Sequence, residues 1–138
     1  MNDTGTPPRD RAAKGSDMAN ILVIDDEPLI AMTMGDWLTD LGHSVVGPAG
    51  DLDDALTLSE AKVDAAILDV SLGPRTTEAV AVRLAARGVP FAVASGHDAA
   101  SLNPVFARGR LLPKPFGFET FRRTVETLLG AQRLPLPD

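Results

Sequence analysis

The sequence contains no cysteine among its 138 residues. Disulfide bonds, thiolate metal sites and thiol catalysis are therefore excluded. No apolar run approaches the roughly 20 residues that a helix needs to cross a bilayer. No basic segment followed by an apolar stretch opens the chain, which argues against export. A cytoplasmic protein is the simplest interpretation of these absences.

Nucleotide-binding signatures are also missing. Neither a G-x-G-x-x-G motif nor a P-loop follows the first expected strand, so a nucleotide-binding fold is disfavoured. The net charge is -6 at pH 7, and residues 1–19 carry as many bases as acids, so the excess lies in the rest of the chain. An acidic domain is a poor electrostatic match for nucleic acid or an anionic membrane, and we expect neither as a partner.

The chain divides into three parts. Residues 1–19 contain glycine and proline without apolar periodicity, and we expect a disordered leader there. Residues 20–130 alternate strand and helix patterns, and their number fits one domain with a single core. Residues 131–138, which end in Leu-Pro-Leu-Pro-Asp, are expected to form a short tail.

Short apolar runs alternate with amphipathic stripes in the central part. The expected strands are residues 21–24, 43–46, 65–68, 91–94 and 111–112, and the second of these is expected near an edge. The expected helices are residues 28–41, 51–61, 76–86 and 118–129, and Gly42, Gly88 and Gly130 are expected to end three of them. This alternation predicts an α/β fold with a five-stranded, doubly wound parallel sheet.

The segment from His97 to Gly109 has the weakest pattern. Asn103-Pro104 interrupts it, and proline disfavours a helical conformation at the residue before it. A doubly wound fold places a further helix, the fourth along the chain, in this segment between the last two strands. We therefore expect this fourth helix to be shortened or mobile, and the segment to be the most mobile part of the domain.

Polar side chains follow four of the five expected strands. In an open parallel sheet, ligands bind outside the carboxyl ends of the strands. The residues at these ends are Asp25 and Asp26 after the first strand, Asp69 after the third, Ser95 after the fourth and Lys114 after the fifth. Three carboxylates, a hydroxyl and an ammonium are thus expected to meet at one edge.

This set of groups suits phosphoryl chemistry. Crowded carboxylates raise one another's pKa unless they share a cation, and a few oxygen ligands completed by water suit Mg²⁺. A hydroxyl and a lysine complete a cradle for a phosphoryl group. A carboxylate nucleophile would then form an aspartyl-phosphate.

Each residue also has a simpler structural interpretation. Asp25 and Asp26 can cap a helix, and Ser95 and Lys114 can be ordinary surface groups. Their convergence on one edge favours the functional interpretation. An aspartyl phosphatase needs a second acid two residues after its nucleophile, and Ser71 holds that position after Asp69, so this class of enzyme is disfavoured.

Four motifs together resemble the bacterial response-regulator receiver domain over about residues 20–130. They are Val23-Ile24-Asp25-Asp26-Glu27-Pro28, Ile67-Leu68-Asp69-Val70, Ala94-Ser95-Gly96 and Lys114-Pro115-Phe116. The resemblance implies a flavodoxin-like sheet of order 2-1-3-4-5 and a cis Lys114–Pro115 peptide.

The resemblance also implies a role for each site residue. Asp69 would be the phosphoacceptor, and Ser95 and Lys114 would bind phosphoryl oxygens. Asp26 would bind Mg²⁺ directly and Asp25 largely through water, and Asp69 and the Ser71 backbone carbonyl would be further ligands.

The implied protein is a single-domain, monomeric response regulator of a two-component system or phosphorelay. It would accept a phosphoryl group from a histidine kinase or a phosphotransfer protein, and would catalyse only its own phosphorylation and dephosphorylation. Output would come from a downstream protein that docks on the face formed by the fourth helix, fifth strand and last helix. The alternative is a phosphate sink or shuttle for a shared kinase, without an output partner.

A narrower resemblance lies around the fourth strand. Pro90-Phe91-Ala92-Val93-Ala94-Ser95-Gly96 resembles in part the "FAT GUY" group of alphaproteobacterial single-domain receivers, which implies an HWE or related kinase as partner. Leu111 stands where most receivers carry a switching aromatic residue. We therefore expect the signal to pass from Ser95 directly into the following loop.

Overall fold

The computed structural model describes residues 18–96 and 103–133 of the chain. Residues 1–17 of the expected leader and 134–138 of the expected tail lie outside the described part. Residues 97–102, the first half of the segment expected to be mobile, also lie outside it. The predictions made for these residues therefore stay predictions.

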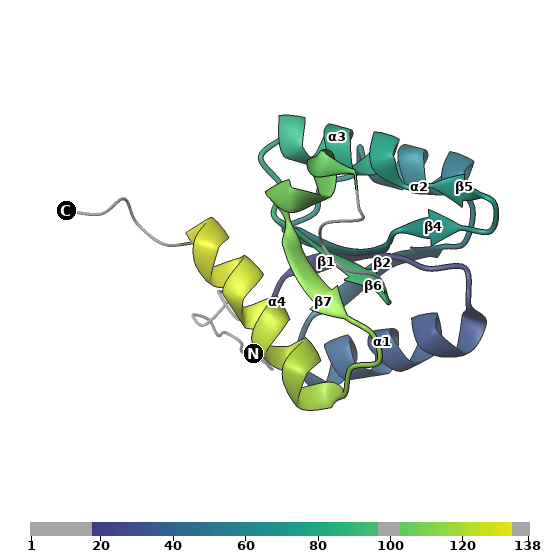
Figure 1. The fold of residues 1–138 in the computed structure, drawn as a ribbon. Coiled ribbons are helices and arrows are strands. Elements are labelled where there is room, and N and C mark those ends of the chain that lie inside the picture. Colours follow the sequence, from purple (N-terminus) through teal and green to yellow (C-terminus); the bar gives the residue numbers. More distant parts are fainter. Residues whose placement is uncertain (1–17, 97–102, 134–138) are drawn as a thin grey trace.

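A five-stranded parallel sheet forms the centre of the domain (Figure 1). Its strands are β1 (Asn20–Ile24), β2 (Ser44–Ala49), β3 (Ala65–Asp69), β6 (Phe91–Ser95) and β7 (Arg110–Pro113). They lie in the order β2-β1-β3-β6-β7, which is the predicted order 2-1-3-4-5 when the strands of this sheet are counted along the chain. The second strand lies at an edge, as predicted.

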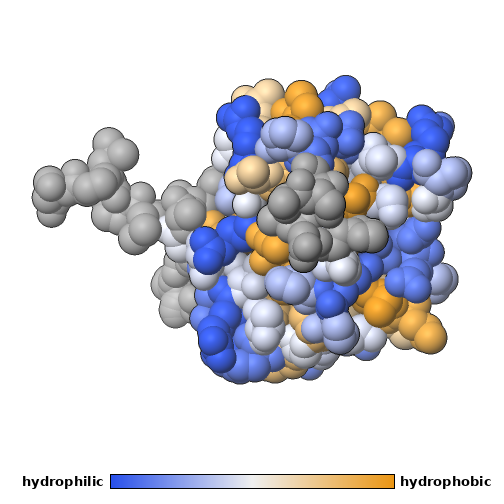
Figure 2. Space-filling view, in the orientation of Figure 1, coloured by the Kyte–Doolittle hydropathy of each residue, from blue (hydrophilic) through white to orange (hydrophobic). Residues whose placement is uncertain are grey.

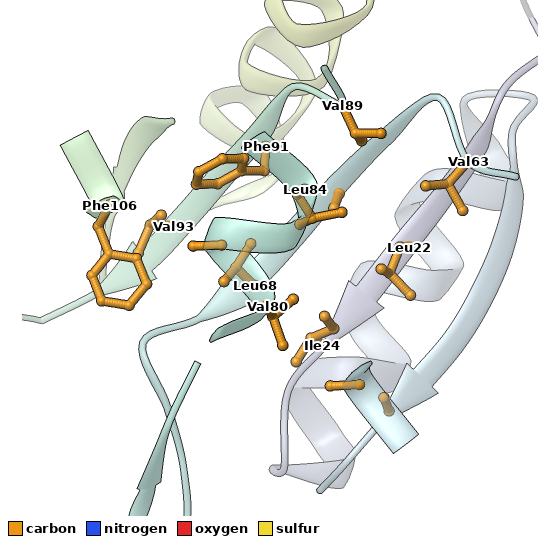
Figure 3. Close-up of a cluster of buried hydrophobic side chains, with 14 of the residues drawn as sticks. Leu22, Ile24, Val63, Leu68, Val80, Leu84, Val89, Phe91, Val93 and Phe106 are labelled. Atoms are coloured by element: carbon orange, nitrogen blue, oxygen red, sulfur yellow. The ribbon is translucent and has the colours of Figure 1, made fainter. Parts of the chain in front are cut away.

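Two helices cover each face of the sheet (Figure 1). These are α1 (Pro28–Asp40) and α4 (Phe118–Arg133) on one face, and α2 (Leu52–Leu58) and α3 (Glu78–Ala86) on the other. Successive strand residues point to opposite faces. Leu22 accordingly packs with the α2 and α3 side, in the cluster drawn in Figure 3, whereas its neighbour Ile21 packs with the α1 and α4 side.

Residues 71–76 form a hairpin that the sequence analysis did not predict. Strands β4 (Ser71–Leu72) and β5 (Arg75–Thr76) pair antiparallel, and Thr77 is the N-cap residue of α3. The helix expected from Thr76 therefore begins two residues later, at Glu78. Figure 1 shows the hairpin on the α2 and α3 side of the sheet.

The last helix continues beyond its predicted end. Gly130 was expected to stop it, but α4 runs through Gly130 to Arg133. A glycine inside a helix costs only about 1 kcal/mol relative to alanine. Leu128 and Leu129, which precede it, are both buried, and their packing outweighs that cost. Gly42 and Gly88 do follow helix ends, with φ of 91° and 72°.

Between β6 and β7, the described residues form a 3-10 helix, η3 (Pro104–Arg108), and no α-helix. The Asn103 side chain accepts a hydrogen bond from the backbone N–H of Val105 at 2.9 Å, and Phe106 is buried. A Cβ atom at Gly109 would lie 2.5 Å from the Phe91 ring, so only glycine fits there. This short element agrees with the shortened fourth helix that Pro104 predicted.

Candidate functional site

Three carboxylates meet at the carboxyl end of the sheet. Asp25 follows β1, Asp26 comes next, and Asp69 ends the neighbouring strand β3. One carboxylate oxygen of each lies within 4.8 Å of the others. Asp25 and Asp69 are 3% and 9% exposed, whereas Asp26 is exposed. The cluster therefore has a buried side and an open side.

Asp25 has one satisfied oxygen and one that lacks a partner. Its Oδ1 accepts a hydrogen bond from the backbone N–H of Glu27 at 2.9 Å. Its Oδ2 is buried without a hydrogen-bond partner in the described part of the chain. Burial, together with the negative charge of Asp69, raises the pKa of Asp25 from 3.8 to about 6.

A cation fits this environment. A buried carboxylate oxygen without a partner is costly to desolvate, and a cation shared by the three aspartates would offset that cost. An all-oxygen ligand set with one open side is the kind of site that hard divalent ions occupy in proteins.

Asp69 and Lys114 form an ion pair. The Lys114 Nζ donates to Asp69 Oδ2 at 3.1 Å, and the backbone N–H of Val70 donates to Asp69 Oδ1 at 2.9 Å. The backbone N–H of Lys114 donates to the Ser95 carbonyl at 2.8 Å, which ties the end of β7 to the end of β6. The Lys114–Pro115 peptide is cis, as the receiver resemblance implied.

The other two predicted site residues lie close to this group. Ser95 is the last residue of β6, is 3% exposed and pairs with Pro113 in the sheet register. Ser71 follows Asp69 by two residues and pairs with Thr76 in the hairpin. The structure thus brings the predicted residues to one edge, and their individual roles stay predictions.

Two residues that contact the site were not predicted from the sequence. The backbone N–H of Gly73, at the hairpin turn, donates to Asp26 Oδ2 at 2.7 Å. The buried Thr77 hydroxyl donates to the Asp69 carbonyl at 2.6 Å. The dipeptide Gly73-Pro74 is a turn signal that could have indicated the hairpin. Nothing local pointed to Thr77.

Sequence comparison finds a partial relative. No protein-family model matches the chain. Among curated proteins, the transcriptional regulatory protein PdtaR of Mycobacterium tuberculosis is 39% identical over 56 residues. That match covers 40% of this chain and 27% of PdtaR, so it spans about a quarter of the relative.

Solved structures match much more of the chain. The response regulator PhyR from Brucella abortus is 26% identical over 87% of this chain and 53% of PhyR, with a TM-score of 0.72. SdrG from Sphingomonas melonis is 37% identical over 82% of this chain and 98% of SdrG, with a TM-score of 0.70. The chain belongs to the response-regulator receiver domains.

Two further comparisons concern ligands of such domains. A structure of SdrG in its BeF3-activated conformation also matches this receiver domain, with 38% sequence identity and a TM-score of 0.65. The receiver domain of the histidine kinase PA1611 from Pseudomonas aeruginosa holds a magnesium ion in its active-site cleft. It is 22% identical over 81% of this chain and 98% of its own, with a TM-score of 0.68, and so shows the shared fold alone.

Within its described residues, this receiver domain has no helix that is both long and apolar enough to span a membrane. The narrower resemblance to the "FAT GUY" group stays a prediction.

Proposed function

We propose that this receiver domain accepts a phosphoryl group on Asp69 from a histidine kinase or a phosphotransfer protein, in a Mg²⁺-dependent reaction. It then signals through a protein partner that binds the phosphorylated form. The observation that carries the proposal is the buried Oδ2 of Asp25, which has no hydrogen-bond partner within residues 18–96 and 103–133 and lies beside Asp26 and Asp69. Lys114 is already paired to Asp69.

The three aspartates would hold the Mg²⁺ ion. The backbone carbonyl of Ser71 would be a further ligand, as the receiver resemblance implies. When bound, the ion neutralises carboxylate charge and coordinates phosphoryl oxygens. The magnesium ion in the PA1611 receiver domain supports this choice of metal.

Asp69 would supply the nucleophile. The phosphorus–nitrogen bond of the donor phosphohistidine breaks as a bond forms from phosphorus to an Asp69 carboxylate oxygen. The donor imidazole keeps the electron pair of the broken bond. Lys114 Nζ, 3.1 Å from Asp69 Oδ2, would pair with the phosphoryl oxygens as negative charge collects there, and Ser95 would place its hydroxyl on another oxygen.

The kinase would dock over the start of α1. Leu29 and Met32 there are 75% and 60% exposed, and Figure 2 shows hydrophobic surface over this part of α1 at the lower right. A groove of about 560 Å³ runs from Asp25 and Asp26 between α1 and β2, with Met32 on its wall. Exposed apolar side chains beside a reactive site indicate a protein-binding surface. An HWE or related kinase is the partner that the partial "FAT GUY" resemblance favours.

The output partner would bind the face formed by η3, β7 and α4. Leu111 on the edge strand β7 is 40% exposed there. In the alternative function, a phosphate sink or shuttle, no partner would distinguish the phosphorylated form, and the phosphoryl group would be lost rapidly.

An NMR titration with Mg²⁺ and then beryllofluoride tests the proposal. We expect Mg²⁺ to shift the amides around Asp25, Asp26 and Asp69, and beryllofluoride to shift those around Ser95 and Lys114. Asp69→Asn should abolish the second set of shifts. If millimolar Mg²⁺ leaves the three aspartates unshifted, or beryllofluoride acts equally on the variant, the proposal is wrong. A pull-down with beryllofluoride-bound protein then separates the regulator from the sink.

A further inference from the structure

Hydrogen bonds connect the β4–β5 hairpin and the residue after it to two members of the acidic cluster, Asp26 and Asp69. Its turn reaches Asp26, which follows β1, and its base adjoins Asp69, which ends β3. Leu72, in the middle of the hairpin, is 4% exposed and packs in the core cluster under α2 and α3. The hairpin is thus anchored in the core and joins two strand ends that carry reactive carboxylates.

The contact at the turn fixes an exposed side chain. The Gly73 N–H donates to Asp26 Oδ2 at 2.7 Å, and the two residues are 47 positions apart in the chain. An exposed carboxylate otherwise samples several rotamers, and ordering it costs conformational entropy when a ligand binds. The amide occupies one oxygen of Asp26 and leaves Oδ1 for a cation. Gly73 has φ of 59°, a left-handed conformation that favours glycine.

The contact at the base fixes the backbone around the phosphoacceptor. The Thr77 hydroxyl is fully buried and donates to the carbonyls of Asp69 and Val70, at 2.6 and 3.0 Å. The Thr77 N–H also donates to the Val70 carbonyl, at 2.9 Å. Hydrogen bonds therefore join the end of β3 and the residue after it to the N-cap residue of α3, at the base of the hairpin.

We infer that the β4–β5 hairpin is a brace that sets the position of the Asp26 carboxylate relative to Asp69, with Gly73 and Thr77 as its positioning residues. The inference rests on the proposed function, because the braced groups are the proposed ligands of Mg²⁺. Groups that orient metal ligands typically change metal affinity by about 10- to 100-fold when they are removed. Preorganised ligands bind more tightly because less ordering remains to be done on binding.

The base of the brace is tested with two variants of one residue. Thr77→Val keeps the shape of the side chain and removes the hydroxyl, whereas Thr77→Ser keeps the hydroxyl. We expect Thr77→Val to weaken Mg²⁺ binding by about 10-fold in calorimetric titration, and Thr77→Ser to stay within about 2-fold of the wild type. A purely structural role would lower the melting temperature of Thr77→Val without changing the affinity of its folded form.

The turn of the brace is tested with a matched pair of glycines. Gly73 and Gly88 have φ of 59° and 72°, and at neither position would an added Cβ have an atom of the described residues within 4 Å. Gly73→Ala and Gly88→Ala therefore impose similar backbone strain, but only Gly73 contacts the site. We expect both to lower the melting temperature by similar amounts, and only Gly73→Ala to weaken Mg²⁺ binding, by about 10-fold. Gly73→Asn, which tolerates the left-handed region, should restore most of the affinity.

The outcomes separate this inference from the proposed function. If the wild type does not bind Mg²⁺, the proposed function fails. If the wild type binds Mg²⁺ and both Thr77→Val and Gly73→Ala bind it equally well, the brace is wrong and the proposed function stands. If Thr77→Val does not fold, the comparison of Gly73→Ala with Gly88→Ala decides the matter.

Discussion

Asp25 and Asp26 are adjacent in the chain and lie on opposite sides of the same site. Asp25 is 3% exposed and has a raised pKa, and its Oδ2 has no hydrogen-bond partner among the residues that the structure describes. Asp26 is exposed, and its Oδ2 accepts a hydrogen bond from the Gly73 amide. The buried side strains the metal-free domain because charge is desolvated there. The exposed side costs little when empty and depends on a hydrogen bond for its order. A cation bound between these two residues would relieve the cost of burying Asp25 and would find the Asp26 carboxylate already positioned.

The largest expected effect is the loss of phosphoryl transfer when Asp69, which lies beside both Asp25 and Asp26, is replaced. We expect Asp69→Asn to abolish phosphoryl transfer completely, because the amide cannot act as the nucleophile. The fold should remain intact, since the side chains are nearly the same size and one of three crowded charges is removed. Radiolabelled phosphate retained on the variant after incubation with an active kinase would overturn the assignment.

The next prediction concerns the exposed side. We expect Mg²⁺ to stabilise the wild type, by about 2.7 kcal/mol at a concentration 100 times its Kd, and Asp26→Asn to lose most of this gain. Thermal unfolding with and without Mg²⁺ measures both. An equal gain in the two proteins would show that Asp26 is not a ligand.

Replacing Asp25, on the buried side, should stabilise the metal-free domain, whereas replacing Asp26 lowers the stability gained from Mg²⁺. In EDTA at pH 7, we expect Asp25→Asn to raise the unfolding free energy by about 2 to 3 kcal/mol, because folding raises the pKa of Asp25 from 3.8 to about 6 and each pKa unit corresponds to about 1.4 kcal/mol. The folded pKa of Asp25, about 6, lies above its ordinary value of 3.8. The folded state therefore binds this proton more tightly, and the contribution of Asp25 to stability falls as pH rises from about 4 to 6.

Urea unfolding in EDTA across that pH range measures whether the contribution of Asp25 to stability falls as pH rises. The difference between Asp25→Asn and the wild type should be small near pH 4 and should grow until about pH 6. A difference that is constant with pH would show that charge burial at Asp25 is not the cause.

The smallest effect is expected for ion pairs at the surface of α4. Arg122 on α4 pairs with Glu119 and with Glu126, one turn away on each side. Such exposed pairs contribute little because water screens them. We expect Arg122→Gln to shift the melting temperature far less than Asp25→Asn does. An equal shift in melting temperature would mean that burial does not determine how strongly a charged side chain of this domain affects its stability.

Much of the fold was accessible from local patterns. The alternation of apolar strands with amphipathic helices predicted the five-stranded sheet, and Pro104 predicted a shortened element where η3 lies. The hairpin was missed because its two strands have two residues each, too few for a period to show. The end of α4 was misplaced because buried leucines beside Gly130 outweigh the preference of glycine for helix ends.

The sequence by itself determined which groups meet at the site. Asp25, Asp26, Asp69, Ser95 and Lys114 follow strands whose carboxyl ends must share one edge of a parallel sheet. Only the tertiary structure decided that Asp25 is buried and Asp26 exposed, and that Gly73 and Thr77 hold the two sides. The reason is physical: burial depends on what packs over a side chain. A hydrogen bond between residues 47 positions apart likewise exists only once the strands between them have assembled.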